Sequence, residues 1–571
     1  MSQSKPRTTA ELPRLIPALR WLPSYQRAWL ARDSIAGFTI WGLLIPEMIA
    51  YASLAGLSPQ AGLYTLLASL GLYALFGTSR ELVVAGTSAS AVLLFSTVTA
   101  LHPKDSAHYA ALAAALVLAT GAFFIVAGLC RLGFITQFLS RPVMEGFVFG
   151  LAIFVTISQL PKLFGLEKGE GDSIRQLAHV IANLGQTSMS TLAVGALSLA
   201  ALFALERWAP KLPGGLLVLA VAIIVSWSLN LSHHGVATVG HIPTGLPSVS
   251  LPHVKAADFW ALIPSAAGMM LVIFSEALGA GQTFADKHRY RLDPNQEMVA
   301  IGLANVGSGF LRGLAAGGSL SQTAVNDGAG ARSQLSSMVA AALSLITVLA
   351  LTPLFTDLPE AVLAALIIHA VSHLMKVAEM RRFYRLMPRE FWLGMLTLVS
   401  VITLDVLPAL IIGVAMSILM LVYRASRPHL SVLGALPDAP GAYADVERHP
   451  DAVPIPGILI VRPNAPLFYA NAQAVQDGIR ALVAQSRPAV HTVLLDLDAN
   501  DEIDITSVEA LTKLAAALER SHVRLGIVHL HGPARDLAER AGLLEHVTDI
   551  HPNLAFAIAW AEDPAYWNSQ H

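Results

Sequence analysis

The sequence predicts a polytopic α-helical membrane protein with about fourteen membrane segments, followed by a small cytoplasmic α/β domain. Of its 571 residues, 54 % are hydrophobic and only 13 % are charged, whereas soluble domains carry nearer a quarter charged residues. Long apolar runs fill residues 34–425, and short β-like runs alternate with amphipathic helices near the C-terminus. The single cysteine, Cys130, excludes an internal disulfide and a cysteine-ligated metal site.

The membrane segments follow from the length rule, which asks for about 20 mostly apolar residues in a spanning helix. Twelve runs approach that length: Ser34–Ala52, Ala61–Phe76, Tyr109–Cys130, Val143–Leu160, Thr191–Leu205, Leu216–Leu229, Phe259–Ala280, Met298–Phe310, Ser336–Leu354, Pro359–Leu374, Phe391–Leu404 and Pro408–Tyr423. Two further segments, Leu82–Thr99 and Ser319–Asp327, begin with small and polar residues. Arginines before the first run and after the last place both termini in the cytoplasm, which suits an even number of spans.

Changes in composition indicate the domain boundaries. We expect residues 1–33 to form a cytoplasmic N-terminal segment, residues 34–426 the membrane domain, and the Pro- and Gly-rich residues 427–456 a linker. The last domain, residues 457–565, contains three β-like runs, "GILIVRP", "HTVLLDLD" and "RLGIVHL". Helices are expected between and after these runs at Ala472–Gln485, Ser507–Ser521 and Pro533–Ala541.

Two polar islands lie in comparable places in the two halves of the membrane domain. They are "VVAGTSASAV" at Val83–Val92 and "AAGGSLSQTAV" at Ala315–Val325. Irregular backbone at membrane depth is tolerated only where protein shields it or where it lines a cavity. One such island is explained by close helix packing through small residues. A matched pair instead indicates an inverted-repeat transporter with a site at the bilayer midplane.

The chemistry of these islands suits an anion. A half-helix starting at Gly86 or Gly318 exposes unpaired N–H groups at a terminus that carries roughly +0.5 charge. Two such ends facing each other form an anion cradle without an arginine. Hydroxyl groups supply further donors at Thr87, Ser88, Ser319 and Ser321.

Among the carboxylates in the apolar runs, two are the main candidates for a role in transport: Glu47 in the first and Glu276 in the eighth segment. Intramembrane carboxylates are costly and usually face a cavity, a partner or a proton path. Because desolvation favours the protonated form, either residue is a candidate proton carrier; the alternative is a neutral structural glutamic acid. By contrast, His241, His369 and His373 are expected at the membrane interface, without a cluster of metal ligands.

Several further motifs occur in order along the chain: "AGFTIWGLLIPEMIAYASLAGLSPQAGLYT", "LYALFGTSRELVVAGTSA", "SRPVMEGFVFGLAIFVTISQL", "VGHIPTGLP" and "SLSQTAVNDGAGARS". Together they resemble the SulP anion transporter family, the relatives of sulfate permeases and prestin. The segment "DEIDITSVEAL" is similar to the STAS domain that ends these transporters. The resemblance covers nearly the whole chain, from Ala36 to Trp560.

This resemblance implies two inverted seven-segment repeats, residues 34–231 and 257–426, arranged as a core and a gate domain. It also implies an elevator-like motion, usually within a homodimer, and a substrate site between the starts of segments three and ten. Glu276 matches the segment-eight carboxylate that is linked to cation or proton coupling. The substrate-site residues carried over onto this chain are Gly86, Thr87, Ser88, Ala89, Ser319, Leu320 and Ser321.

The chain departs from the family pattern at two positions. Many members place Arg where this chain has Gln322, and many carry Gln where this chain has Glu47. Without a fixed positive charge, we expect anion binding to need a bound cation, and the additional acid favours a proton. Sodium-coupled bicarbonate members use a segment-eight Asp with a Thr four residues on; here Glu276 and Ala280 occupy those places, which weakens the sodium interpretation.

We therefore expect a secondary active transporter that takes up sulfate, a small dicarboxylate or a similar oxyanion together with a proton. It would lie among the lipids of a plasma membrane, of the bacterial inner-membrane type. The alternatives are sodium-coupled bicarbonate symport or anion exchange and, less favoured, an anion channel. An enzyme is not expected, because the chain has no Gly-Lys-Ser/Thr nucleotide-binding loop; the prediction includes no cofactor, metal or nucleic acid.

One residue of the STAS-like domain is a candidate for regulation. In soluble relatives of this domain, a serine at the position of Thr506 is phosphorylated at a helix N-terminus. A phosphate there would add nearly two negative charges near the positive end of the helix. The alternative, which we prefer, is that Asp504, Thr506 or Ser507 simply caps that helix.

Overall fold

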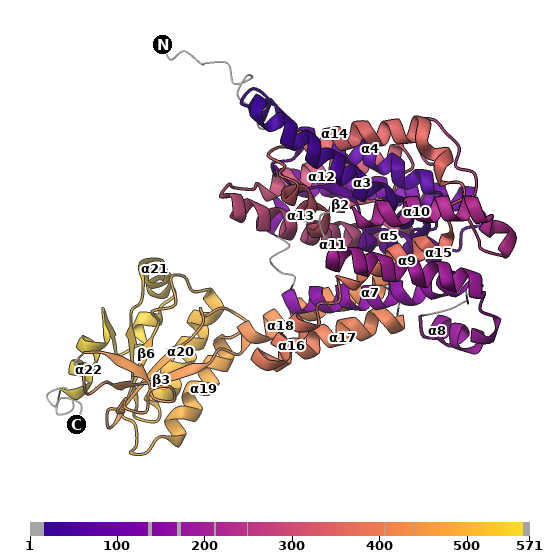
Figure 1. Ribbon diagram of the computed structural model, residues 1–571. Coiled ribbons are helices and arrows are strands. Elements are labelled where there is room, and N and C mark those ends of the chain that lie inside the picture. Colours follow the sequence, from indigo (N-terminus) through magenta and orange to yellow (C-terminus); the bar gives the residue numbers. More distant parts are fainter. Residues whose placement is uncertain are drawn as a thin grey trace, which may run out of the picture. The chain divides into compact units, whose positions relative to one another are not determined.

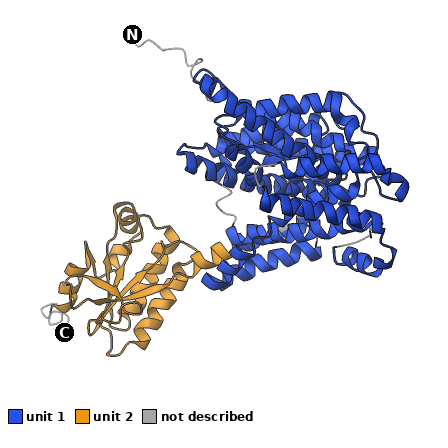
Figure 2. Ribbon diagram, viewed as in Figure 1, with its two compact units in different colours: residues 1–417 blue, residues 418–571 orange. Residues whose placement is uncertain are grey.

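The computed structural model describes residues 16–134, 140–167, 169, 173–209, 213–247, 249–404, 406–439 and 441–563. The chain divides into two units, Met1–Ser417 and Ile418–His571, and the division falls within helix α18 (Val406–Ser426) (Figure 2). The first fifteen residues of the expected N-terminal segment, and residues 564–565 of the expected last domain, lie outside the described residues.

The first unit is helical, and each expected membrane segment contains a helix in the described part of the chain. The first half comprises α3 (Leu30–Leu54), α4 (Pro59–Phe76), α5 (Ser88–Ala100), α6 (Ser106–Leu129), α7 (Arg141–Phe164), α9 (Met189–Trp208) and α10 (Gly214–Leu229). The second half comprises α11 (Ala256–His288), α12 (Pro294–Phe310), α13 (Leu320–Gly328), α14 (Leu335–Ile346), α15 (Glu360–Ser372), α17 (Pro388–Leu404) and α18. Short helices outside the expected segments are α2 (Ala18–Trp21), α8 (Ser173–Ala182) and α16 (Val377–Leu386).

Length and composition support membrane insertion of this unit. Seven helical stretches among the described residues are long and apolar enough to cross a bilayer, the longest being Ala256–His288. The shorter apolar stretches include Ser88–Ala100 and Gly214–Leu229. Local sequence marks several of the helix ends: Asp105 caps α6, Asp293 caps α12, and α7 ends at Gly165, which adopts φ 67°.

A two-stranded ribbon lies inside this helical unit, where the polar islands were expected. Strands β1 (Val84–Gly86) and β2 (Ala316–Gly318) are buried and pair antiparallel. In Figure 1 the label β2 lies among the helices of this unit. Each strand leads directly into a half-length helix, β1 into α5 and β2 into α13. One continuous apolar core surrounds the ribbon and draws residues from both halves of the unit.

Two buried carboxylates hold the loops that flank the ribbon. Glu297 of α12 accepts hydrogen bonds from the Tyr73 hydroxyl at 2.6 Å and from the Thr78 N–H at 2.7 Å. Asp33 of α3 accepts from the N–H of Arg332 at 2.6 Å and from the hydroxyl of Ser333 at 2.8 Å. A buried charge is tolerated only when it is hydrogen-bonded in this way, and the bonds anchor the chain before β1 and after α13.

The second unit is a six-stranded mixed sheet with the strand order β4-β3-β5-β6-β7-β8. The antiparallel part is formed by β4, β3 and β5, and β5 to β8 are parallel. The strands are β3 (Leu430–Ala435), β4 (Tyr443–Asp445), β5 (Ile458–Pro463), β6 (Thr492–Asp496), β7 (Arg524–Val528) and β8 (Asp549–His551). The helices are α19 (Ala472–Gln485), α20 (Ile505–Glu519), α21 (Gly532–Arg540) and α22 (Leu554–Glu562).

Each face of this sheet has its own core, because successive strand residues point to opposite sides. In β5, Leu459 and Val461 pack against α19 and α20, whereas Ile458 and Ile460 pack with α22. The expected strands and the helices at residues 472–485, 505–519 and 532–540 are confirmed within two residues.

The linker expected at residues 427–456 is wrong. Its first part forms β3 and β4, and β3 pairs with β5 in the register Leu430 opposite Pro463 to Leu433 opposite Ile460. The Pro- and Gly-rich composition belongs to the turn between the two strands and to the connection after β4. A strand this short is specified by the partner it pairs with, so its own composition did not reveal it. Strand β8 and helix α22 were not expected either.

Candidate functional site

The ribbon sets the geometry of the candidate site. Val84 lies opposite Gly318, and Gly86 lies opposite Ala316. Because the strands are antiparallel, α5 and α13 leave the ribbon at its opposite ends, each with its N-terminal turn next to it. The first N–H groups of a helix have no acceptor within that helix. The ribbon thus brings together two helix N-termini and their partial positive charges.

The N-cap residues of both half-helices are hydroxyl residues of the islands. Thr87 caps α5 in a reciprocal capping box with Ser90, with both bonds at 3.1 Å. Ser319 caps α13 by accepting from the Gln322 N–H at 3.5 Å. One lone pair of each of these hydroxyls is therefore committed to its own helix. The N–H groups of Ser88, Ala89 and Leu320 precede the capped positions and have no acceptor within their helices.

Exposure differs between the two ends. Thr87, Ser88 and Ala89 are buried, with 7 %, 8 % and 1 % of their surface exposed. Leu320 and Ser321 are exposed at the start of α13, and the Ser321 Oγ lies 3.0 Å from the Ser319 Oγ. A ligand thus has access to the cradle from the α13 end.

Glu47 meets the start of α13 directly. The Gln322 Nε2 donates to the Glu47 Oε2 at 2.8 Å and lies 3.4 Å from the carbonyl oxygen of Gly86. Gln322 is only 1 % exposed, and its Oε1 is buried without a hydrogen-bond partner among the described residues. One amide therefore links a carboxylate on α3, the end of β1 and the first turn of α13.

Glu276 lies on α11, which packs on β2, and glycines allow both carboxylate helices to approach the ribbon. A Cβ placed on Gly86 would lie 3.0 Å from the Sδ of Met48, the residue that follows Glu47. A Cβ placed on Gly318 would lie 2.9 Å from the Cα of Ala277, next to Glu276. Each helix thus packs on the ribbon through the residue that follows its glutamate.

Tyr51 was missed by the sequence reasoning. It is 6 % exposed and its hydroxyl interacts with the Ser88 side chain. It stands four residues after Glu47, so the two side chains share one face of α3. That spacing was the available signal. Tyr51 thus connects the Glu47 face of α3 to the first residue of α5.

An ionic contact anchors the far end of α13. The Lys287 Nζ lies 2.6 Å from the Asp327 Oδ2, and the His288 Nε2 lies 2.6 Å from its Oδ1. Asp327 is on α13, and the two basic residues end α11, the helix of Glu276. This contact connects the position of α13 to that of the Glu276 helix.

The expectation that the histidines form no group of metal ligands is wrong for two of them. His369 and His373 lie beside Glu206, with their ligand atoms all within 4.8 Å of one another. The glutamate is distant in sequence, on α9, so only the packing of α9 with α15 reveals the group. His241 is exposed in a loop.

In the second unit, Asp504 caps α20, as the preferred interpretation held. Its Oδ1 accepts from the Ser507 N–H at 2.8 Å, and its Oδ2 accepts from the Tyr469 N–H at 2.6 Å. Burial opposes ionisation of Asp504, but these hydrogen bonds outweigh it and lower its pKa from the ordinary value. Thr506 is exposed in the first turn of α20.

Comparison with known families gives two matches that together span most of the chain. The sulfate permease family model matches residues 30–397, and the STAS domain model matches residues 449–557. The first match contains the ribbon, both half-helices, Glu47 and Glu276. The second contains α20 and its cap.

Known proteins are similar along almost the full length. A probable sulfate transporter of Mycobacterium tuberculosis is 34 % identical over 535 residues, covering 94 % of this chain and 95 % of that protein. Human solute carrier family 26 member 6 is 32 % identical over 503 residues, covering 84 % and 66 %.

Solved structures show the same fold. The murine solute carrier 26 family member A9 anion transporter, in its inward-facing state, superposes with a TM-score of 0.89 at 24 % identity, covering 98 % of this chain and 96 % of that chain. The transmembrane domain of a cyanobacterial bicarbonate transporter, BicA, gives a TM-score of 0.60 at 25 % identity, covering 68 % and 98 %.

Proposed function

The chain belongs to the sulfate permease family, and from that premise we propose that it takes up sulfate across the membrane together with a proton. The family is one of anion transporters, and the chain is an integral membrane protein that ends in a STAS domain. Its relatives named as sulfate transporters support sulfate as the substrate. The proton is inferred from the site.

The observation that carries the proposal is the hydrogen bond between Gln322 and Glu47 at the first turn of α13. The N-termini of α5 and α13 attract an anion through their N–H groups and dipoles. An ionised Glu47 repels that anion. At roughly 6 Å and an effective dielectric constant of about 20, each unit charge on the anion is repelled by about 3 kcal/mol, so a sulfate dianion is repelled by roughly 6 kcal/mol. Protonation of Glu47 removes it, so anion and proton bind together.

Gln322 allows this coupling because it carries no charge. A neutral amide holds the Glu47 side chain in place but leaves the charge of the carboxylate uncompensated. The unpartnered Oε1 of Gln322 offers an acceptor for the proton of a neutral Glu47 after rotation of the amide. Glu276, on the helix α11 that packs on β2, is the second proposed carrier.

The remaining features of the proposal concern assembly and motion. We propose a core domain that contains the ribbon and moves by an elevator-like step against a gate domain, within a homodimer. The protein would lie in a bacterial-type inner membrane with both termini in the cytoplasm. Arginines before α3 and after α18 support that orientation by the positive-inside rule.

The test is uptake of radiolabelled sulfate, bicarbonate and succinate into proteoliposomes. Each anion is offered with an inward proton gradient, with an inward sodium gradient, and with neither. Accumulation of sulfate only with the proton gradient supports the proposal. Accumulation of bicarbonate only with sodium would contradict it and would favour the alternative of sodium–bicarbonate symport; the likeness to BicA, a bicarbonate transporter, supports testing that anion.

A further inference from the structure

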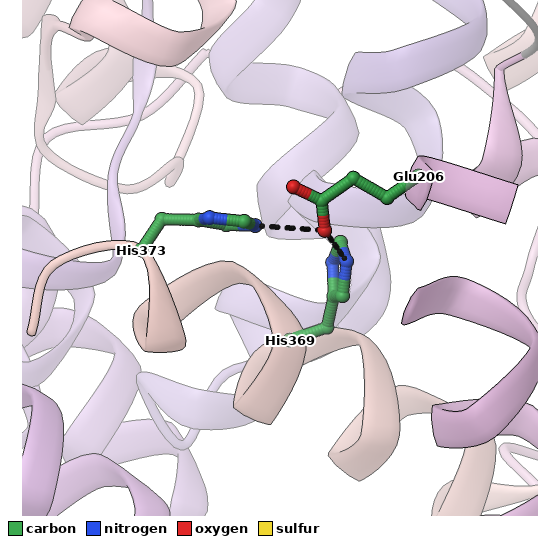
Figure 3. A group of neighbouring side chains, drawn as sticks. All are labelled: Glu206, His369 and His373. Carbon is green, nitrogen blue, oxygen red and sulfur yellow. Dashed lines mark hydrogen bonds and ion pairs between the residues drawn. The ribbon is translucent and has the colours of Figure 1, made fainter. Parts of the chain in front are cut away.

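We propose that Glu206, His369 and His373 form a binding site for one Zn²⁺ ion that joins α9 to α15. This site is separate from the ribbon and independent of the transported anion. The His369 Nε2 lies 2.9 Å from the Glu206 Oε2, and the His373 Nε2 lies 3.5 Å from the same oxygen. Figure 3 shows the carboxylate between the two imidazole rings.

The distances fit tetrahedral zinc. Zinc binds histidine nitrogen at about 2.0–2.1 Å and carboxylate oxygen at about 2.0–2.2 Å. Ligand atoms at two corners of such a tetrahedron are therefore about 3.3 Å apart. The two separations from the Glu206 Oε2, 2.9 and 3.5 Å, bracket that value. The two histidine nitrogens lie within 4.8 Å of each other, a bound wider than one ion allows. Small side-chain rotations bring them to one ion.

The ligands are held in place by their helices. His369 and His373 are four residues apart, which places both rings on one face of α15. Phe203 of α9 packs edge-on against the His369 ring, with centroids 4.9 Å apart, and restricts its orientation. Glu206 extends from the last turn of α9. Two histidines and one glutamate are a ligand set that zinc uses in proteins with a fourth, open position.

The charge at this point also favours a cation. Glu206 lies in the last turn of α9, His369 lies in the last turn of α15, and His373 is the C-cap of α15. Each helix C-terminus carries roughly −0.5 charge, and Glu206 adds a full negative charge. The side chains of Glu206 and His373 are each 47 % exposed, and that of His369 is 20 % exposed. Water thus reaches the group and can supply the fourth ligand.

The ion would act as a clamp between two helices rather than as a catalyst. Calcium and magnesium are poor candidates, because both prefer oxygen ligands to imidazole. Zinc bound only by the folded protein raises its melting temperature by mass action, since the three ligands come from two helices and converge only when these are packed together.

The experiment measures zinc bound per chain in full-length protein purified in detergent with a histidine-free affinity tag. Elemental analysis after equilibration with Zn²⁺ should give about one ion per chain and a raised melting temperature. The variants His369→Ala and His373→Ala should lose the ion and the thermal shift. The matched control His241→Ala, which removes an exposed histidine elsewhere, should keep both.

A second variant and a spectroscopic probe separate loss of the site from loss of the fold. Glu206→His replaces one zinc ligand with another and should retain the ion. Co²⁺ in place of zinc should show the intense visible absorption of a tetrahedral site in the wild type and in Glu206→His, but not in His373→Ala. The proposal is overturned if the wild type binds no more Zn²⁺ than His369→Ala/His373→Ala, or if Glu206→Ala leaves the affinity unchanged.

Discussion

Gln322 and Glu47 lie 275 positions apart in the chain, yet the Gln322 amide donates to the Glu47 carboxylate at 2.8 Å. The contact joins the first turn of α13 to the middle of α3, with the end of β1 beside it. A carboxylate thus faces a place where two helix N-termini favour an anion. The predictions on transport depend on the repulsion between this carboxylate and a bound anion.

Substitution Glu47→Gln removes the proposed proton site while keeping the shape of the side chain. We expect proton-driven accumulation of sulfate to fall at least tenfold and its dependence on pH to flatten, because the repulsion of roughly 6 kcal/mol between Glu47 and a sulfate dianion no longer has to be relieved. Uptake is measured in proteoliposomes between pH 5.5 and 8. Glu167→Gln, at an exposed loop position, is the matched control. An unchanged pH profile in Glu47→Gln would refute the role of Glu47.

Substitution Gln322→Arg adds the fixed charge that this site lacks. An arginine at this position pairs with Glu47 and cancels its charge, so sulfate no longer needs a proton to bind. We expect sulfate binding at pH 7.5 to strengthen and proton-driven accumulation to weaken. Isothermal titration at several pH values measures the first effect, and proteoliposome uptake measures the second. Binding that keeps the pH dependence of the wild type would count against the proposal.

Substitution Glu276→Gln tests the second carboxylate. We expect it to abolish proton-driven uptake while leaving sulfate exchange or binding at least partly intact, because the cradle itself is formed by other residues. Counterflow of labelled sulfate between equal concentrations measures exchange without a driving force. Full concentrative uptake by this variant would remove Glu276 from the coupling mechanism.

Substitution Gly318→Ala tests the packing of α11 on the ribbon. A Cβ at this position would lie 2.9 Å from Ala277, so the helix or the ribbon must shift. We expect uptake to fall about tenfold or more, together with a lower melting temperature, since overpacking typically costs about 1–3 kcal/mol. The control is Gly279→Ala on helix α11, where an added Cβ meets nothing within 4 Å. If the two variants behave alike, the close approach is unimportant.

Substitution Asp504→Ala tests the helix cap in the STAS domain. We expect α20 to lose about 1 kcal/mol of stability at neutral pH, measured by hydrogen exchange of its amides. The pKa of Asp504 is lower in the folded chain than in the unfolded chain. Its contribution to the stability of the fold is therefore complete above its unfolded-state pKa of about 3.9, and it is lost as the pH falls through its folded-state pKa. Thr506 lies two residues further on and is exposed, so Thr506→Ala should change the hydrogen exchange of the α20 amides far less. Equal effects of the two variants would contradict the assignment of the cap to Asp504.

Much of the architecture was predictable because its signals are local. The length of apolar runs predicts the membrane helices, and alternating strands and amphipathic helices predict the C-terminal α/β domain. Glycines and hydroxyl residues in an apolar setting predict a break before a half-helix. The observed caps at Thr87 and Ser319 fall within one residue of the predicted glycine breaks.

The tertiary structure decided the features that depend on residues far apart in the chain. The pairing of β1 with β2 and the contact of Gln322 with Glu47 each require the two halves of the membrane unit to meet, and the contact of Tyr51 with Ser88 requires α3 to meet α5. The same holds for Glu206 beside the two histidines of α15. Composition and periodicity describe one segment at a time, whereas these contacts arise from packing between segments. The sequence by itself therefore determined which residues are chemically suited to a site, and only the folded chain determined which of them come together.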